Sequence, residues 1–225
     1  RYWSSDVCSS DLHADYAMGL NNLGVLYSEM GNYKAAEGYY KEALEIRKKI
    51  LGEEHSDYAM SLNSLGSLYH EVGNYKAVEP YYIESAVIYE KILGHEHPTY
   101  AYSLNNLGVL NSDMGQYRGA ESYFKKALEI YKKKFGEEHV DYAMGLSNLG
   151  DLYSEMGDYK AALPFYRESF EIKEKNLVGS FQWLSEKQRE AYWVMVSGMV
   201  KNLNEFAVVA HDTLPASTQL AYEDR

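Results

Sequence analysis

The sequence predicts an all-α protein, a right-handed solenoid of four helix pairs that ends in one C-terminal capping helix. Three observations support this fold class. Residues 13–36 return as residues 139–162, with 20 of the 24 aligned positions identical. Two further copies, which begin at His55 and His97, keep the same register and give a period of 42 residues. Within each copy, apolar residues recur three and four positions apart, which is the spacing of an amphipathic helix.

The period divides most of the chain into four units, residues 13–54, 55–96, 97–138 and 139–180. The first helix of each unit is expected to follow an N-cap whose side-chain oxygen accepts from free amides of the first turn; these N-caps are Asp15, Asp57, Thr99 and Asp141. The first helix is expected to end at a left-handed glycine, and a polar residue then caps the second helix. The glycines are Gly31, Gly73, Gly115 and Gly157, and the second caps are Asn32, Asn74, Gln116 and Asp158.

A further glycine interrupts each first helix and predicts close contact with the second helix, because glycine inside a helix needs a packing reason. In the first unit this glycine belongs to the array Leu23, Gly24, Tyr27, Ala36, Tyr40 and Ala43. The array resembles the signature of the tetratricopeptide repeat, and its 42-residue period resembles the subtype of kinesin light chains and many bacterial signalling proteins. Asn111 departs from this pattern, because the other units have tyrosine there. The resemblance implies a concave groove, lined by the first helices, that binds a peptide or protein segment.

Asparagines lie half-way along the first helices, although asparagine is a poor helix former. Amide side chains can both donate to and accept from the backbone of an extended peptide. Together with the resemblance, this favours a groove that contains Asn21, Asn22, Asn63, Asn105, Asn106 and Asn148. The alternative is an asparagine ladder that only fixes the stacking of the repeats.

No basic residue occurs among the other positions expected to face the groove, which are Met18, Val25, Met60, Ser67, Tyr102, Val109, Met144, Ser147 and Asp151. Acidic residues are expected near its edge, at Glu29, Glu71, Asp113 and Glu155. We therefore expect a neutral or basic peptide or protein ligand, and not the acidic C-terminus that a carboxylate clamp binds. A purely structural scaffold or self-assembling solenoid is the alternative function.

The two ends of the chain lie outside the repeats. Residues 1–12 are interpreted as a non-native remnant of a sequencing adaptor or, alternatively, as a disordered native tail. Ser185 and Gln188 predict a capping box, so a capping helix is expected over residues 181–211, followed by a truncated linker at residues 212–225. The motif from Phe181 to Trp193 resembles the segment before a caspase-like CHAT domain in bacterial tetratricopeptide proteins. The chain is therefore expected to be the recognition part of a longer protein that also has further upstream repeats.

The composition argues against several classes of protein. With 33 acidic and 22 basic residues the formal net charge is −11, which disfavours a nucleic-acid partner. No apolar run reaches the roughly 18 residues of a membrane span, and the single cysteine, Cys8, fits a cytoplasmic protein. No nucleophile motif, phosphate loop or convergent metal set occurs, so we expect no enzyme activity, metal or cofactor. The equivalent loop histidines, His13, His55, His97 and His139, are expected to structure turns. Partner identity and oligomeric state are left open.

Overall fold

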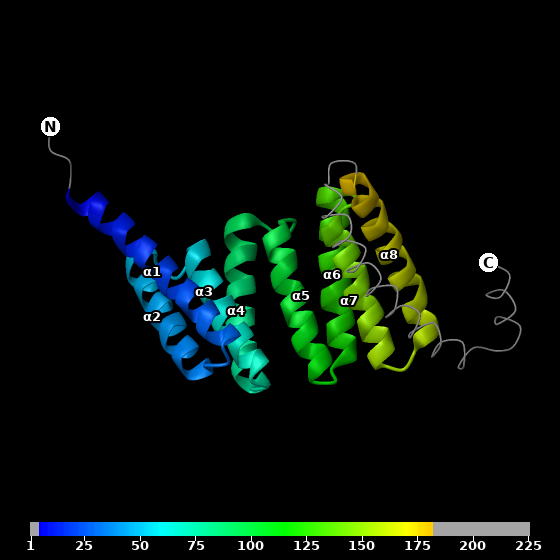
Figure 1. The fold of residues 1–225 in the computed structure, drawn as a ribbon, viewed down its shortest axis with the longest axis horizontal. Helices are drawn as coiled ribbons and strands as arrows, with labels where there is room; N and C mark the ends of the chain where they lie inside the picture. The colour runs from blue at the N-terminus through cyan, green and yellow to red at the C-terminus, as the bar shows by residue number, and fades with distance from the viewer. Residues whose placement is uncertain (1–4, 182–225) are drawn as a thin grey trace, which may run out of the picture. The chain divides into compact units, whose positions relative to one another are not determined.

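The computed structural model describes the backbone of residues 5–181 and the side chains of residues 13–177. These residues form eight α-helices, and no strand occurs among them (Figure 1). The helices are α1 (Ser5–Glu29), α2 (Tyr33–Leu51), α3 (Ser56–Glu71), α4 (Tyr75–Leu93), α5 (Pro98–Asp113), α6 (Tyr117–Phe135), α7 (Val140–Glu155) and α8 (Tyr159–Phe181). The predicted all-α fold of four helix pairs is confirmed. The expected capping helix and linker lie outside the described residues, apart from Phe181, where α8 ends.

Helices one repeat apart begin at equivalent residues. The first helices α3, α5 and α7 start at Ser56, Pro98 and Val140, each 42 positions after the last. All four second helices start at a tyrosine, and these tyrosines, Tyr33, Tyr75, Tyr117 and Tyr159, keep the same spacing. The period therefore sets the helix bounds as well as the order of the helices.

The predicted N-caps of the first helices are wrong. The N-caps of α3, α5 and α7 are His55, His97 and His139, whose Nδ1 atoms accept from the backbone N–H two residues on, at 3.1–3.2 Å. An imidazole nitrogen can serve as this acceptor, so the helix starts earlier and the residue predicted to cap it lies in its first turn. The first helix of the chain differs again, because α1 begins at Ser5 and continues through Asp15. It therefore includes residues 5–12, which the sequence assigns to a tail.

The turn within each helix pair has the predicted chemistry. Gly31, Gly73, Gly115 and Gly157 have φ of 74°, 73°, 71° and 76°, the left-handed conformation that favours glycine. The Oδ1 atom of Asn32 accepts from Ala35 N at 3.3 Å, and that of Asp158 accepts from Ala161 N at 3.1 Å. Asn74 occupies the same position without a side-chain capping bond. The turn thus brings the two helices of a pair back against each other.

The described helices belong to two compact units, one that extends to Lys134 and one that begins at Phe135. In the first unit, α2 packs on α1 and α3, and α4 packs on α3 and α5; in the second unit, α8 packs on α7. The close approach predicted at the first-helix glycines is confirmed, because a Cβ on Gly24 would lie 2.5 Å from the ring of Tyr40. Within the first unit, the core lies between successive helices and leaves one face of α1, α3 and α5 open for a site.

Candidate functional site

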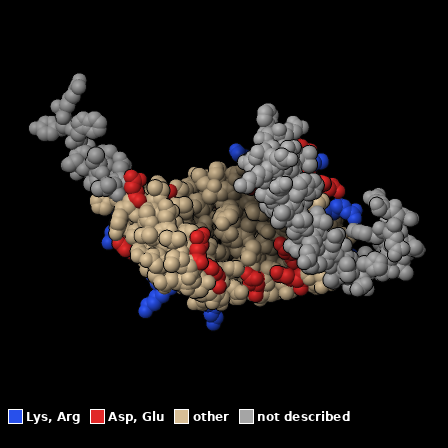
Figure 2. Space-filling model, viewed as in Figure 1, with Lys and Arg blue, Asp and Glu red and all other residues tan. Residues whose placement is uncertain are grey.

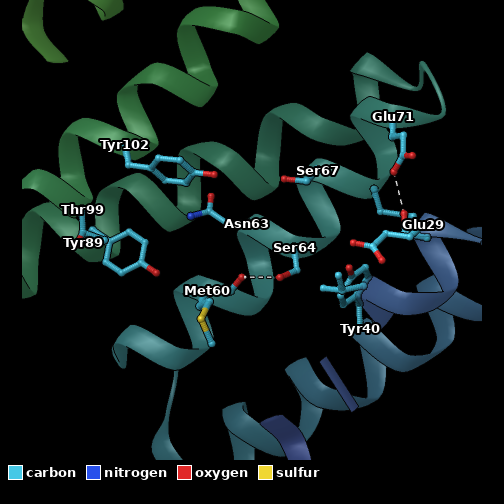
Figure 3. Close-up of a pocket in the computed structure, with 13 residues that line it drawn as sticks. Glu29, Tyr40, Met60, Asn63, Ser64, Ser67, Glu71, Tyr89, Thr99 and Tyr102 are labelled. Carbon is cyan, nitrogen blue, oxygen red and sulfur yellow. Dashed lines mark hydrogen bonds between the residues drawn. The ribbon is translucent and has the colours of Figure 1, made fainter. Parts of the chain in front are cut away.

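A cavity of about 420 Å³ opens in the first unit, where side chains of α1 to α5 meet (Figure 3). It is lined by Val25, Ser28, Glu29, Tyr40, Met60, Asn63, Ser64, Ser67, Leu68, Glu71, Tyr89, Thr99 and Tyr102. The first helices α1, α3 and α5 supply most of these residues, and Tyr40 and Tyr89 come from α2 and α4. The cavity is therefore a groove across three first helices, as the resemblance implies.

The walls of the groove present apolar surface to solvent. Val25, Met60 and Tyr102 line it and are exposed, whereas Tyr40, Leu68 and Tyr89 are buried behind them. The buried residues belong to the cores that join neighbouring helices, so these walls are held by packing. A ligand that covered the exposed side chains would gain the free energy of removing apolar surface from water.

The charged residues that line the groove are both acidic. Glu71 accepts a hydrogen bond from Ser28 Oγ at 2.7 Å and one from Tyr33 Oη at 3.3 Å, which fix its carboxylate. In Figure 3, Glu29, Glu71 and Tyr40 lie at the same end of the groove. Burial, and then the negative charges of Glu71 and Glu29, raise the pKa of Tyr40, so both carboxylates act on one place.

Acidic side chains are also exposed beside the groove. In the space-filling view of Figure 2, acidic side chains lie next to one another on the face of the first unit. None of the residues that line the groove is basic. The charge on the groove lining is therefore of one sign, negative.

Three of the candidate asparagines occupy one repeat position, 42 residues apart. Asn21 and Asn105 are buried, and Asn63 is half-buried and lines the groove. The Oδ1 atom of each of the three is buried and accepts no hydrogen bond. An asparagine ladder would need these oxygens to accept from neighbouring amides, so the structure does not support the ladder. Asn105 instead donates from Nδ2 to Tyr131 Oη at 3.3 Å, within its own helix pair.

The other three candidates occupy the next position in the repeat, and they do not line the groove. Asn22 is exposed, and Asn106 and Asn148 are half-buried. The Nδ2 atom of Asn106 is buried without a partner. Asn148 belongs to α7, in the second compact unit, apart from the unit that holds the groove. Of the six predicted site residues, the structure thus brings only Asn63 into this groove.

Comparison with known proteins supports the resemblance noted in the sequence. The family model of the tetratricopeptide repeat matches residues 15–85, 79–133 and 110–175, which together span more than half of the chain. The chain belongs to the tetratricopeptide repeat family. A search of curated protein sequences found no match.

Solved structures show the same fold. BtubC (BKLC) from P. vanneervenii superposes with a TM-score of 0.64 at 24% identity, and the match covers 71% of this chain and 63% of that one. A putative kinesin light chain of Podosopora anserina with nearly identical repeats gives 0.60 at 18% identity, over 89% and 97% of the two chains. The apo form of RapI gives 0.63 at 16% identity, over 92% and 60%. The chain thus spans less than two thirds of BtubC and RapI, and its fold is similar to that of the kinesin light chain-like repeat protein.

The tetratricopeptide period could have located several groove residues that were not predicted. Ser28 and Ser64 follow predicted groove positions by one helical turn or less, and both line the cavity. A second set that was not predicted occupies one repeat position of the second helices. Its members are Arg47, Tyr89, Tyr131 and Lys173. These side chains lie behind the first helices; Lys173, for example, donates from Nζ to Ser147 Oγ at 2.8 Å. Burial lowers the pKa of Lys173, while the charge of Asp151 opposes the shift, so in the second unit a partly desolvated amine lies against Ser147, a predicted groove position.

Residues 13–177 offer no cluster of three or more potential ligands that could hold a metal ion. None of the described helices is long and apolar enough to cross a membrane. The chemistry of this tetratricopeptide groove is therefore that of its apolar walls, its amides and its carboxylates.

Proposed function

We propose that this chain, a protein-interaction module of the tetratricopeptide kind, binds an extended, neutral or basic segment of a partner protein in the groove of its first unit. The observation that supports the proposal is the 420 Å³ cavity, which combines exposed apolar walls with charge of one sign. Val25, Met60 and Tyr102 would contact ligand side chains, Asn63 would pair with the ligand backbone, and Glu29 and Glu71 would attract a cation.

The proposal predicts a specific response to charge in the ligand. The purified chain is probed with an array of extended peptides that differ only in lysine, glutamine or glutamate at each position. Lysine peptides should bind more tightly than glutamate peptides, and the difference should shrink as salt screens the carboxylates. Tight binding of peptides that end in acidic residues contradicts the charge assignment. Failure of every peptide to bind leaves the structural-scaffold function in its place.

The wider protein context is part of the same proposal. The motif from Phe181 to Trp193 resembles the segment that precedes a CHAT domain, and it lies almost wholly outside the described residues. On this basis the chain would be the recognition part of a bacterial cytoplasmic protein whose peptidase domain follows it. The chain would then recruit a partner and perform no catalysis itself. Sequencing the parent gene tests this, because an unrelated downstream domain would remove the peptidase context while leaving the groove proposal intact.

A further inference from the structure

The exposed face of α4 differs from that of the other second helices. In those helices a basic residue and a glutamate follow each other four positions apart; the pairs are Lys41 with Glu45, Lys125 with Glu129, and Arg167 with Glu171. At the same two repeat positions α4 has Ile83 and Val87, which are 43% and 57% exposed. Pro80, one turn before Ile83, is exposed as well. Single apolar residues are common on protein surfaces, but these three lie on one side of one helix and form a continuous apolar stripe.

Glu79 lies one turn before Ile83, on the same side of α4, and is exposed. Its equivalent on α2, Glu37, accepts from Lys41 Nζ at 2.5 Å and from Tyr69 Oη at 2.6 Å. The ammonium of the first contact has no counterpart on α4, because Ile83 occupies the repeat position of Lys41. Glu79 therefore lacks the lysine that pairs with its equivalent four positions along the helix.

The second donor to this carboxylate is also replaced. Asn111 occupies the repeat position of Tyr69, which is the departure from the pattern noted in the sequence. Its Nδ2 donates to the carbonyl oxygen of Leu107 at 2.8 Å, so the amide is turned towards its own helix. On α6, a Cβ on Gly119 would lie 2.6 Å from Asn111 Oδ1, and the other second helices have alanine at this position. The helices after α4 are thus built for an asparagine here, and Glu79 is left without a tyrosine.

The equivalent carboxylates show which group completes this position. Glu37 holds the ammonium of Lys41 at 2.5 Å, and Glu121 holds that of Lys125 at 2.6 Å. Glu79 has the same side chain at the same place on its helix, so a cation brought by another protein can occupy the position that a lysine of the chain occupies elsewhere. Exposed ion pairs contribute little by themselves, so the apolar residues beside Glu79 have to supply most of the binding free energy.

The spacing of residues on α4 fits a helix as the covering element. Glu79, Ile83 and Val87 follow at four-residue steps, so they form one ridge about 12 Å long. On α2, the ridge from Ala36 to Leu44 has the same steps and packs against two leucines of α3. A partner helix with apolar residues opposite Ile83 and Val87 would bury them in the same way. About two to three helical turns are enough to reach from these residues to Glu79.

The charges of α4 bear on whether the covering helix belongs to a partner or to a second copy. The exposed charged residues of α4 are Lys76, Glu79, Glu84, Glu90 and Lys91. Lys91 pairs with Glu54, which leaves mainly carboxylates beside the apolar stripe. The chain as a whole has a formal net charge of −11, so two copies repel each other. These charges favour a partner protein that brings lysine or arginine.

We propose that Glu79, Pro80, Ile83 and Val87, which we call the α4 face, form a second interaction surface. It binds an amphipathic helix of a partner protein that has apolar residues at four-residue steps and a lysine or arginine at the end of that row. None of the four residues lines the groove, so the α4 face is separate from the site proposed above. Its mode is also different, because a helix packed on an apolar ridge does not need the free backbone amides of an extended peptide.

The probe is a pair of synthetic helical peptides of about 15 residues. Each has leucines at four-residue steps on one face and a side-chain lactam on the opposite face, because isolated helices of this length are marginal. One peptide has lysines at the ends of the leucine row, and its twin has glutamates there. Fluorescence anisotropy should show saturable binding of the lysine peptide to the full chain, at least tenfold tighter than that of the twin. Absence of binding by the lysine peptide, or equal binding of the two peptides, overturns the proposal.

The decisive variant restores the repeat pattern on α4. Ile83→Lys with Val87→Glu gives α4 the pair found in α2 and α6, adds one charge of each sign and so keeps the net charge at −11. It should weaken binding of the lysine peptide at least tenfold. Lys41→Glu with Glu45→Lys, which exchanges the charges at the equivalent positions of α2, is the matched control and should leave binding unchanged. Circular dichroism verifies folding, and Val87→Glu alone replaces the α4 pair if that variant does not fold. Equal binding by the wild-type chain and the folded α4 variant overturns the proposal.

Two single variants separate the charge of the α4 face from that of the groove. Glu79→Gln should weaken binding of the lysine peptide about threefold at low salt and less at high salt. Glu37→Gln is its control and should change binding less, because Lys41 holds the carboxylate of Glu37. Glu71→Gln, in the groove, should bind the peptide like the wild-type chain. A loss with Glu71→Gln equal to that of the α4 variant would place the peptide in the groove and overturn the proposal.

Sedimentation velocity without peptide tests whether a second copy occupies the α4 face. A monomer at high protein concentration is expected, because the copies repel. A dimer that Ile83→Lys with Val87→Glu abolishes would overturn the proposal in favour of self-association.

Discussion

The guanidinium of Arg47 donates to Ser61 Oγ at 2.7 Å and to the carbonyl oxygen of Asp57 at 3.0 Å, and so joins α2 to α3. Arg47 is buried, and burial lowers its pKa while the charge of Asp57 opposes the shift. The cation is therefore held in a poorly solvated place by two neutral oxygens and one nearby carboxylate. It forms a link between two consecutive helix pairs within the first unit.

Replacing Arg47 by alanine should destabilise the first unit by about 3 kcal/mol, because it opens a cavity and leaves Ser61 Oγ without its donor. Urea unfolding followed by circular dichroism measures the loss. Arg118→Ala is the matched control, since Arg118 is exposed on α6, and it should change stability by less than about 0.5 kcal/mol. Equal effects of the two substitutions would show that the Arg47 contacts do not stabilise the fold.

Two glycines within first helices should respond in opposite directions to alanine. A Cβ on Gly66 would collide with the buried ring of Tyr82, whereas a Cβ on Gly19 would meet nothing within 4 Å. Gly66→Ala is therefore expected to destabilise by about 1–3 kcal/mol through overpacking. Gly19→Ala should stabilise by about 1 kcal/mol through helix propensity. Thermal unfolding of both variants checks the contrast, and a stabilising Gly66→Ala would mean that Tyr82 can move aside freely.

The repeat period explains why the fold could be predicted so closely and parts of the site could not. Bounds of α3, α5 and α7 follow from the register, because each unit has the same turn glycines. The N-caps could not be chosen from residue type, since aspartate is a common N-cap, whereas here the imidazole Nδ1 of His55 accepts from the backbone N–H of Asp57. Likewise, Asn21 is buried and its neighbour Asn22 is exposed, because α1 is rotated about its own axis so that one of them faces α2. The sequence does not give this rotation, since it depends on how the helices pack against each other.

Stability should fall in alkaline solution because several tyrosines are harder to ionise in the folded chain. Burial first, with help from nearby carboxylates, raises the pKa of Tyr58, Tyr69 and Tyr89 from 10.0 to about 12. A raised pKa means that the folded state binds the proton more tightly than the unfolded state does. Their contribution is therefore fully present below pH 10 and is lost as the pH rises towards about 12.

Ultraviolet titration of tyrosinate tests this against thermal unfolding at the same pH values. Tyr58→Phe keeps the ring and removes the hydroxyl that donates to Glu84. The loss of folding stability at alkaline pH should therefore be smaller in this variant. Ionisation of all tyrosines near pH 10 before any unfolding would contradict the expectation.

The carboxylate of Glu71 should strengthen the binding of lysine-containing peptides to the groove. Glu71→Gln keeps the shape and removes the charge, so affinity should fall about threefold at low salt and less at high salt. Glu79→Gln, at an exposed position of α4 outside the groove, is the control for the general acidity of the chain. Anisotropy titrations with the tightest lysine peptide of the array provide the measurement. Equal losses in both variants would assign the attraction to net charge.

Asn63 should matter for binding while its replacement improves folding. Its Oδ1 atom is buried without a hydrogen-bond donor, and an unsatisfied buried carbonyl costs about 1–3 kcal/mol. Asn63→Ala removes this atom and also raises helix propensity, so the melting temperature should rise. Peptide affinity should fall at the same time, because the variant loses the amide that lines the groove.

Asn22→Ala is the control, since Asn22 is exposed and does not line the groove; it should add only the propensity gain and leave affinity unchanged. A lower melting temperature for Asn63→Ala would instead show that the amide holds the stacked helices together.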